Sequence, residues 1–163
     1  LPTSDSIWVV NTTEPGNVTC RRDHIWDVKG TNVSFTRYLR NNTVESHENL
    51  TGLLFDWDDM DEEHPPYNRL LISKYNGGWY SQEDLAYLTS DAGCAVTSVL
   101  MVGLSKANGK PLQWTDIRMP DSKVSTSTPQ DCLEAFYNIT HLAKEHWRQA
   151  YYSECRGSLK GNS

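Results

Sequence analysis

The sequence contains no apolar run close to the roughly 20 residues that a membrane-spanning helix requires, so no transmembrane helix is expected. Basic residues are not in excess either. The net charge is -6 and the pI is about 5.3, which argues against nucleic-acid binding, because a phosphate-binding face needs clustered Lys and Arg. No secretory hydrophobic segment precedes Leu1. We therefore expect the numbering to start at a mature N-terminus, after removal of any signal peptide.

Local signatures of common catalytic and metal sites are missing as well. There is no G-x-S-x-G, no P-loop and no G-x-G-x-x-G. His141 and His146 are five residues apart, whereas the two histidines of H-E-x-x-H lie four apart on one helix face. The acidic run at 56–63 lacks the glycine and terminal glutamate of a calcium-binding EF-hand loop, so a solvated hairpin loop is the simpler interpretation. We expect no metal, no cofactor and no enzymatic activity, although a triad assembled only in three dimensions would leave no such signature.

Cysteines and glycosylation acceptors place the protein outside the cell. The four cysteines include no C-x-x-C pair, which favours disulfides over a thiolate metal site. Six N-x-S/T triplets occur where chance would supply roughly two, which predicts a secreted, glycosylated protein. The cysteines are Cys20, Cys94, Cys132 and Cys155, and the acceptors are Asn11, Asn17, Asn32, Asn41, Asn49 and Asn138.

The stretch from Asp84 to Gly103 organises the predicted fold. It holds two strand-like runs, at 85–89 and 95–102, and the second is almost continuously apolar and flanked by glycine, which predicts a strand buried on both faces. Elsewhere in the chain, short strands separated by turn signals about every ten residues predict an all-β barrel or sandwich. In one of them, Val33, Phe35 and Arg37 alternate with polar residues and should share a face.

A single amphipathic helix is predicted near the C-terminus. Thr128 is a suitable N-cap, Pro129 suits the first turn, and Asp131 adds an acid near the helix start. We expect this helix to pack its apolar face on the outside of the barrel. The residues of that face are Cys132, Phe136, Ile139, Ala143 and Trp147. The predicted organisation is one domain over residues 1–156 and a flexible tail over 157–163.

Aromatic residues and acids supply the candidate ligand site. In a closed barrel of about eight strands, inward aromatic rings line a cavity for one small ligand, although most of the six tryptophans should simply fill the core. An inward carboxylate among such rings would hold a small cation by ion pairing and by attraction to the ring face. The wall candidates are Phe55, Trp57, Tyr87 and Trp114, and the carboxylate candidates are Asp56, Asp58, Glu83 and Asp84.

The second half of the chain contains Cys94-Ala95-Val96, then Leu112-Gln113-Trp114, then a cysteine that opens the amphipathic helix and a final cysteine near the C-terminus. This arrangement resembles that of the tick salivary lipocalins, which include histamine-binding proteins. The resemblance implies a mainly β fold, an eight-stranded antiparallel lipocalin barrel with the C-terminal helix packed on the outside. It also implies the disulfides Cys20–Cys155 and Cys94–Cys132. The implied function is that of a secreted, monomeric protein that captures a host inflammatory mediator, by default histamine or serotonin.

Two positions depart from the family's amine-binding signature. Ala95 replaces the acid after the first cysteine, and Leu112 replaces the glutamate before the tryptophan. A protonated amine in a dry cavity needs a neutralising carboxylate, so Glu83 or Asp84 would have to supply it.

Two other functions fit the same residues. The barrel could hold a lipid mediator or sterol, such as a leukotriene, a fatty acid or cholesterol, with Trp114 as an apolar wall and Arg37 or Arg69 meeting a carboxylate. Alternatively, the protein could bind a host protein through its outer surface.

Overall fold

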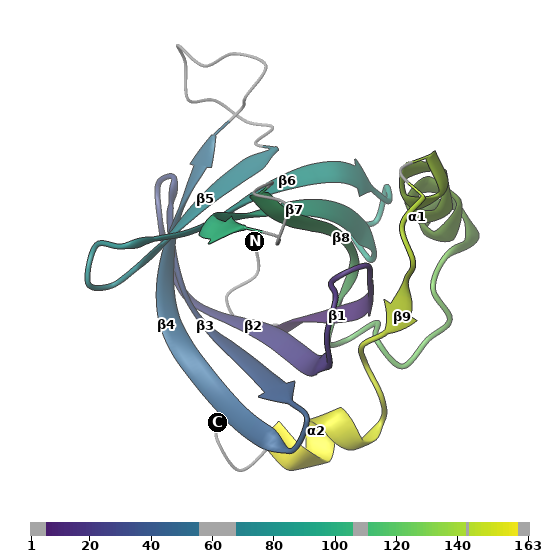
Figure 1. The fold of residues 1–163 in the computed structure, drawn as a ribbon, viewed down its shortest axis with the longest axis horizontal. Coiled ribbons are helices and arrows are strands. Elements are labelled where there is room, and N and C mark those ends of the chain that lie inside the picture. The colour runs from purple at the N-terminus through teal and green to yellow at the C-terminus, as the bar shows by residue number, and fades with distance from the viewer. Residues whose placement is uncertain (1–5, 56–67, 106–110, 143, 160–163) are drawn as a thin grey trace.

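Eight antiparallel strands close into a barrel, with a ninth short strand and two helices outside it (Figure 1). The computed structural model describes residues 6–55, 68–105, 111–142 and 144–159. The elements are β1 (Ser6–Thr12), β2 (Val18–Lys29), β3 (Asn32–Asn41), β4 (Val44–Phe55), β5 (Arg69–Lys74), β6 (Trp79–Leu88), β7 (Ala95–Ser105), β8 (Pro111–Pro120), α1 (Gln130–Leu142), β9 (Arg148–Gln149) and α2 (Glu154–Leu159). Each strand from β2 to β7 pairs with the next, and β1 pairs with both β8 and β2, which closes the ring. No helix in these ranges is long and apolar enough to span a membrane.

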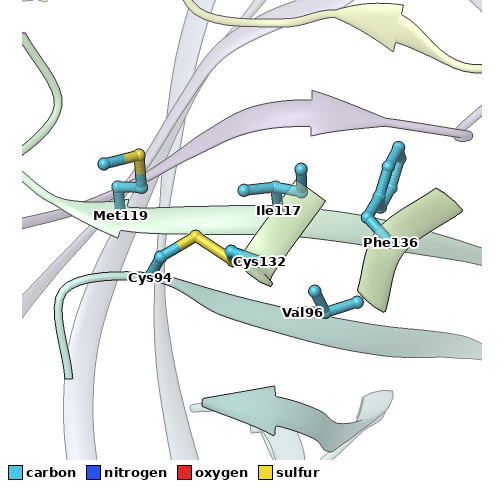
Figure 2. Packing of buried hydrophobic residues seen from close by; sticks show 6 residues of the cluster. All are labelled: Cys94, Val96, Ile117, Met119, Cys132 and Phe136. Atoms are coloured by element: carbon cyan, nitrogen blue, oxygen red, sulfur yellow. A yellow bond between two sulfur atoms is a disulfide. The ribbon is translucent and has the colours of Figure 1, made fainter. Parts of the chain in front are cut away.

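The strand β7 is buried on both faces, as its apolar run predicts. Val96 is fully buried on the outer face, where it packs beneath α1 with Ile117 of β8 and Phe136 of the helix (Figure 2). Val99 lies on the opposite face and is also buried. The disulfide Cys94–Cys132 joins the start of β7 to the first turn of α1, so the helix is covalently held to the sheet that it covers.

The helix α1 begins where the sequence predicts but ends earlier. It starts at Gln130, directly after the proline, and stops at Leu142. Lys144 has a φ of 55° and its N–H donates to the carbonyl of His141, an αL ending that a non-glycine residue rarely adopts. The predicted helical position of Trp147 is therefore wrong. Its ring still packs edge-on against Phe136, with centroids 6.3 Å apart, because the chain folds back after the helix.

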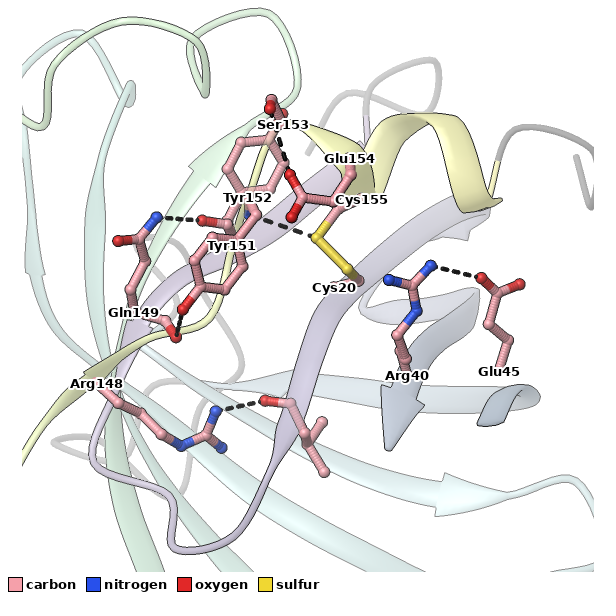
Figure 3. The surroundings of a disulfide bond; sticks show 11 residues. Cys20, Arg40, Glu45, Arg148, Gln149, Tyr151, Tyr152, Ser153, Glu154 and Cys155 are labelled. Atoms are coloured by element: carbon pink, nitrogen blue, oxygen red, sulfur yellow. Dashed lines mark hydrogen bonds and ion pairs between the residues drawn. A yellow bond between two sulfur atoms is a disulfide. The ribbon is translucent and has the colours of Figure 1, made fainter. Parts of the chain in front are cut away.

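The segment after α1 inserts at the place where β1 and β2 separate, which we call the seam. Ala150 donates its N–H to the carbonyl of Val10 in β1 and accepts from the N–H of Cys20 in β2. Cys20 is in turn bonded to Cys155 of α2 (Figure 3). Together with Cys94–Cys132, both disulfides therefore have the pairing that the resemblance implies. The helix α2 runs to Leu159 and thus includes residues 157–159, which the sequence assigned to the flexible tail.

One half of the barrel interior is a packed apolar core. Phe35 of β3 lies beside Leu50 of β4, and Ile72 of β5 completes the layer; all three are buried. Because directly paired residues share a face and side chains alternate along each strand, Arg37 points into the same interior two residues beyond Phe35. The predicted common face of Val33, Phe35 and Arg37 is confirmed, and it turns from apolar to charged along the strand.

Candidate functional site

Three charged side chains from strands that do not pair with one another meet inside the barrel. Arg37 of β3 approaches Glu83 of β6 at 3.0 Å (Nη1 to Oε2), and Arg118 of β8 donates to the other Glu83 oxygen at 2.6 Å. Arg37 and Glu83 are only 3% and 4% exposed. Such a meeting across the sheet is possible only in the interior, so these residues mark the centre of the barrel.

Two further carboxylates extend this cluster. Asp23 of β2 accepts two hydrogen bonds from Arg37, at 2.7 and 2.8 Å, and Asp116 of β8 accepts one from Arg118 at 3.0 Å. We call the resulting chain the central network, and its members are Asp23, Arg37, Glu83, Arg118 and Asp116. Three carboxylates face two guanidinium groups, so the network carries one formal negative charge.

Burial and ion pairing act in opposite directions on the central network. Burial alone would raise the pKa of Glu83, but Arg118 and Arg37 outweigh it and hold that pKa well below its usual value. Burial would likewise lower the pKa of Arg37, yet Asp23 and Glu83 together raise it. The charges therefore stay in place at neutral pH despite the dry surroundings.

A pocket of about 210 Å³ opens beside the network, between β3, β4 and β6. We call it the rim pocket, and its lining residues are Arg37, Leu39, Ser46, His47, Glu48 and Tyr80. Glu48 pairs with Arg37 across β3 and β4 and so shares its face. Among the residues that the structure describes, its carboxylate has one ion pair, a loose one with Lys74 at 3.6 Å, and both side chains are more than one-third exposed. The Tyr80 ring lies 5.7 Å from the Arg37 guanidinium carbon.

A second charged group lies inside the seam. Arg21 of β2 is buried and donates through both Nη atoms to Glu14, at 2.9 and 3.2 Å. Its guanidinium carbon lies 5.5 Å from the ring centroid of Trp114 in β8. Arg148 of β9 also reaches this place and donates to the backbone carbonyls of Glu14 and Val18. We call Arg21, Trp114, Arg148 and Glu14 the seam cluster.

Three of the predicted site residues face the interior. Glu83 is inward, but Arg37 and Arg118 already neutralise it, so it is not a free counter-ion for an amine. Trp114 is inward and 5% exposed, on the same face as its neighbour Val99. Arg37, the predicted partner of a carboxylate, is also inward but belongs to the central network.

Three other candidate residues do not face the interior. Asp84 follows Glu83 and so points outward, where it binds Arg69 at 2.6 and 2.9 Å; neither lines the interior. A β-bulge between Leu85 and Tyr87 reverses the alternation, so Tyr87 faces α1 and donates to Asp131 at 2.6 Å. This hydrogen bond raises the pKa of Tyr87.

Some predicted positions lie outside the described residues. They are the side chain of Phe55, and Asp56, Trp57 and Asp58. Three interior or rim residues were not predicted: Glu48, Arg21 and Arg118. Each is a charged residue in a strand, and the sequence carries no signal that separates an inward position from an outward one.

The glycosylation acceptors remain predictions. Five of them are exposed, and Asn11 is half-buried in β1, where it pairs with both β8 and β9. The exposed acceptors are Asn17, Asn32, Asn41, Asn49 and Asn138. Within the part of the chain that the structure describes, no group of three or more His, Cys, Asp or Glu side chains is arranged to hold a metal ion.

Comparison with solved structures identifies the fold. The chain is similar to the AM182 serotonin complex, with 13% identity, a TM-score of 0.61 and coverage of 94% of this chain and 86% of that one. It is similar to insecticyanin from the tobacco hornworm Manduca sexta, with 12% identity, a TM-score of 0.58 and coverage of 93% and 79%. It is also similar to a mutant of LTBP1 in complex with leukotriene C4, with 12% identity, a TM-score of 0.56 and coverage of 93% and 84%. No family model matches the sequence, and no curated protein matches it. The fold is that of the lipocalins.

Proposed function

We propose that this lipocalin-fold protein is secreted, as in the tick salivary type, and removes a small mediator by stoichiometric binding rather than by turnover. The closed barrel, with charged side chains converging in its interior and a pocket at its rim, supports capture. The two disulfides and the six glycosylation acceptors support an extracellular location. A structural neighbour that holds serotonin supports a ligand of that size.

The single observation that carries the ligand class is the excess of acid around the rim pocket. The central network contributes one net negative charge, and Glu48 adds a carboxylate whose only ion pair among the described residues is the loose one with Lys74. Surface pairs of this kind contribute about 0–1 kcal/mol, so a ligand can displace Lys74 at little cost. A protonated amine is thus the complementary ligand, and histamine and serotonin are our candidates.

The chemistry of the pocket fits such a ligand in two ways. The ammonium group of the ligand would donate to Glu48 in a charge-assisted hydrogen bond, and the aromatic ring of the ligand would pack against Tyr80. A volume of about 210 Å³ is below the roughly 300–1,000 Å³ typical of sites for drug-sized molecules, which favours a compact amine over a long lipid.

Native mass spectrometry of the purified protein tests this proposal. Histamine, serotonin, leukotriene B4 and cholesterol would each be added separately, and we expect a 1:1 adduct with an amine. A lipid adduct without any amine adduct would replace the proposal with the second candidate. If none of the four binds, the barrel is not the functional site and the search moves to host proteins on the outer surface.

The second candidate ligand is a lipid mediator or sterol. It is favoured by one observation: Trp114 and Val99 form an inward apolar wall on the opposite side of the interior from the rim pocket. A structural neighbour that binds leukotriene C4 supports this class.

A further inference from the structure

Hydrogen-bond donors without an acceptor are concentrated at one place in the protein. Within the described residues, five buried side-chain nitrogens have no hydrogen-bond partner. Three of them belong to the seam cluster: Nε of Arg21, Nη2 of Arg148 and Nε1 of Trp114. Buried polar groups in folded proteins are nearly always hydrogen-bonded, so three such donors at one place call for a specific explanation.

The charge of the seam cluster points to the missing chemistry. Two guanidinium groups share a single carboxylate, that of Glu14. Arg21 is bonded to both of its oxygens, while Nη2 of Arg148 is 3.8 Å from Oε1, beyond hydrogen-bonding distance. The cluster therefore has one formal positive charge and donors to spare, whereas the central network has a negative charge and every carboxylate bonded.

We propose that the seam cluster is a second, anion-selective site, which binds the carboxylate of an amphipathic ligand. The carboxylate would accept hydrogen bonds from the free donors of Arg21, Arg148 and Trp114. The apolar body of the ligand would lie along the indole ring of Trp114 and against Val99, which pairs with Trp114. Guanidinium groups bind carboxylates in charge-assisted hydrogen bonds, which are about twice as strong as neutral ones. A protonated amine would meet a net positive charge here, and the carboxylate of the cluster, that of Glu14, is already bonded to Arg21.

This site rests on the ligand-capture function proposed above, but none of its residues lines the rim pocket. The two sites therefore have opposite charge preference and lie on different strands: β3, β4 and β6 form the rim pocket, and β2, β8 and β9 form the seam cluster. The lipocalin interior would then select ligands by charge on each side of the central network.

NMR of the indole N–H groups tests the anion site directly. The protein has six tryptophans, and the signal lost in Trp114→Phe assigns Trp114. Decanoate is the probe and decanol is its uncharged control. We expect decanoate to shift the Trp114 indole proton downfield in a saturable way, and decanol to bind at least about tenfold more weakly, because it lacks the charge.

Two variants with a matched control separate recognition from a general loss of structure. Arg21→Lys keeps the positive charge but removes the Nε donor and the planar fork, and should weaken decanoate binding about tenfold. Trp114→Phe keeps a six-membered aromatic ring and removes the indole N–H together with the five-membered ring, so it should weaken binding about fivefold by calorimetry. Arg40 binds Glu45 and belongs to neither the seam cluster nor the lining of the rim pocket, so Arg40→Lys should leave binding unchanged (Figure 3).

Equal binding of decanoate and decanol, or equal binding to Arg21→Lys and Arg40→Lys, would overturn the anion site. Serotonin titrated in parallel distinguishes the two proposals. Serotonin binding without a decanoate shift at Trp114 leaves the amine function and rejects the seam site, whereas the reverse outcome keeps the seam site and rejects the amine.

Discussion

Removal of the charge of Glu83 should be among the most damaging single changes to the barrel. Glu83→Gln preserves the shape of the side chain but leaves Arg37 and Arg118 facing a neutral amide in a dry interior. Breaking a buried ion pair by neutralising one partner costs about 3–5 kcal/mol. Each arginine keeps a second carboxylate, Asp23 or Asp116, so we expect the lower end, about 3 kcal/mol.

Urea denaturation at pH 7 measures this loss, and the m-value should stay constant. For a chain of 163 residues, about 3 kcal/mol corresponds to a fall in Tm of roughly 6–12 °C. The neighbouring residue provides the control: Asp84 makes a similar bidentate pair with Arg69, but on the outer face, where Asp84 is 30% exposed. Asp84→Asn should cost about 1 kcal/mol or less. If Glu83→Gln costs no more than Asp84→Asn, the central network does not hold the barrel together as we describe.

Three further predictions follow from the same structure. Acid should destabilise the protein, because the pKa of Glu83 is lowered in the folded state. The contribution of the Glu83 charge to the free energy of unfolding is complete above the ordinary glutamate pKa of about 4.3 and is lost as the pH falls below it. In acid, the free energy of unfolding should therefore fall less steeply for Glu83→Gln than for the wild type. Replacing both Cys94 and Cys132 by alanine removes a link across 38 residues and should cost about 3–4 kcal/mol by chemical denaturation; unchanged stability would show that packing alone holds α1 to the sheet. Gly52→Ala should cost about 1–2 kcal/mol, because the added Cβ would lie 2.5 Å from Cδ1 of Leu70, and the double variant with Leu70→Val should recover part of the loss; a neutral Gly52→Ala would contradict this packing.

Features that depend on local sequence could be predicted. The apolar run of β7 indicated burial on both faces, and Val96 and Val99 are buried on opposite sides of the strand. The capping residues before α1 indicated its start. Its end was not predicted, because Lys144 adopts a positive φ that is usual for glycine and for which the sequence gives no warning.

Features that depend on contacts between distant strands could not be predicted. Glu83 is separated from Arg118 by 35 residues and from Arg37 by 46, so no local pattern reveals that both arginines neutralise it. Tyr87 would face inward by simple alternation from Glu83, but the bulge after Leu85 shifts it to the outer face. Our candidate for the amine-binding carboxylate is therefore Glu48 rather than Glu83, and no sequence motif marks the position of Glu48.

The most direct test of the capture function is isothermal titration of serotonin and histamine into the wild type, Glu48→Gln and Glu45→Gln at pH 7.4. Glu45 lies on the same strand as Glu48 but binds Arg40 and does not line the rim pocket, so it is the matched control. We predict one amine per protein, a Kd at least about tenfold higher for Glu48→Gln, since a charge-assisted hydrogen bond is lost, and an unchanged Kd for Glu45→Gln. No binding to the wild type, or equal binding to all three proteins, would contradict amine capture at the rim pocket.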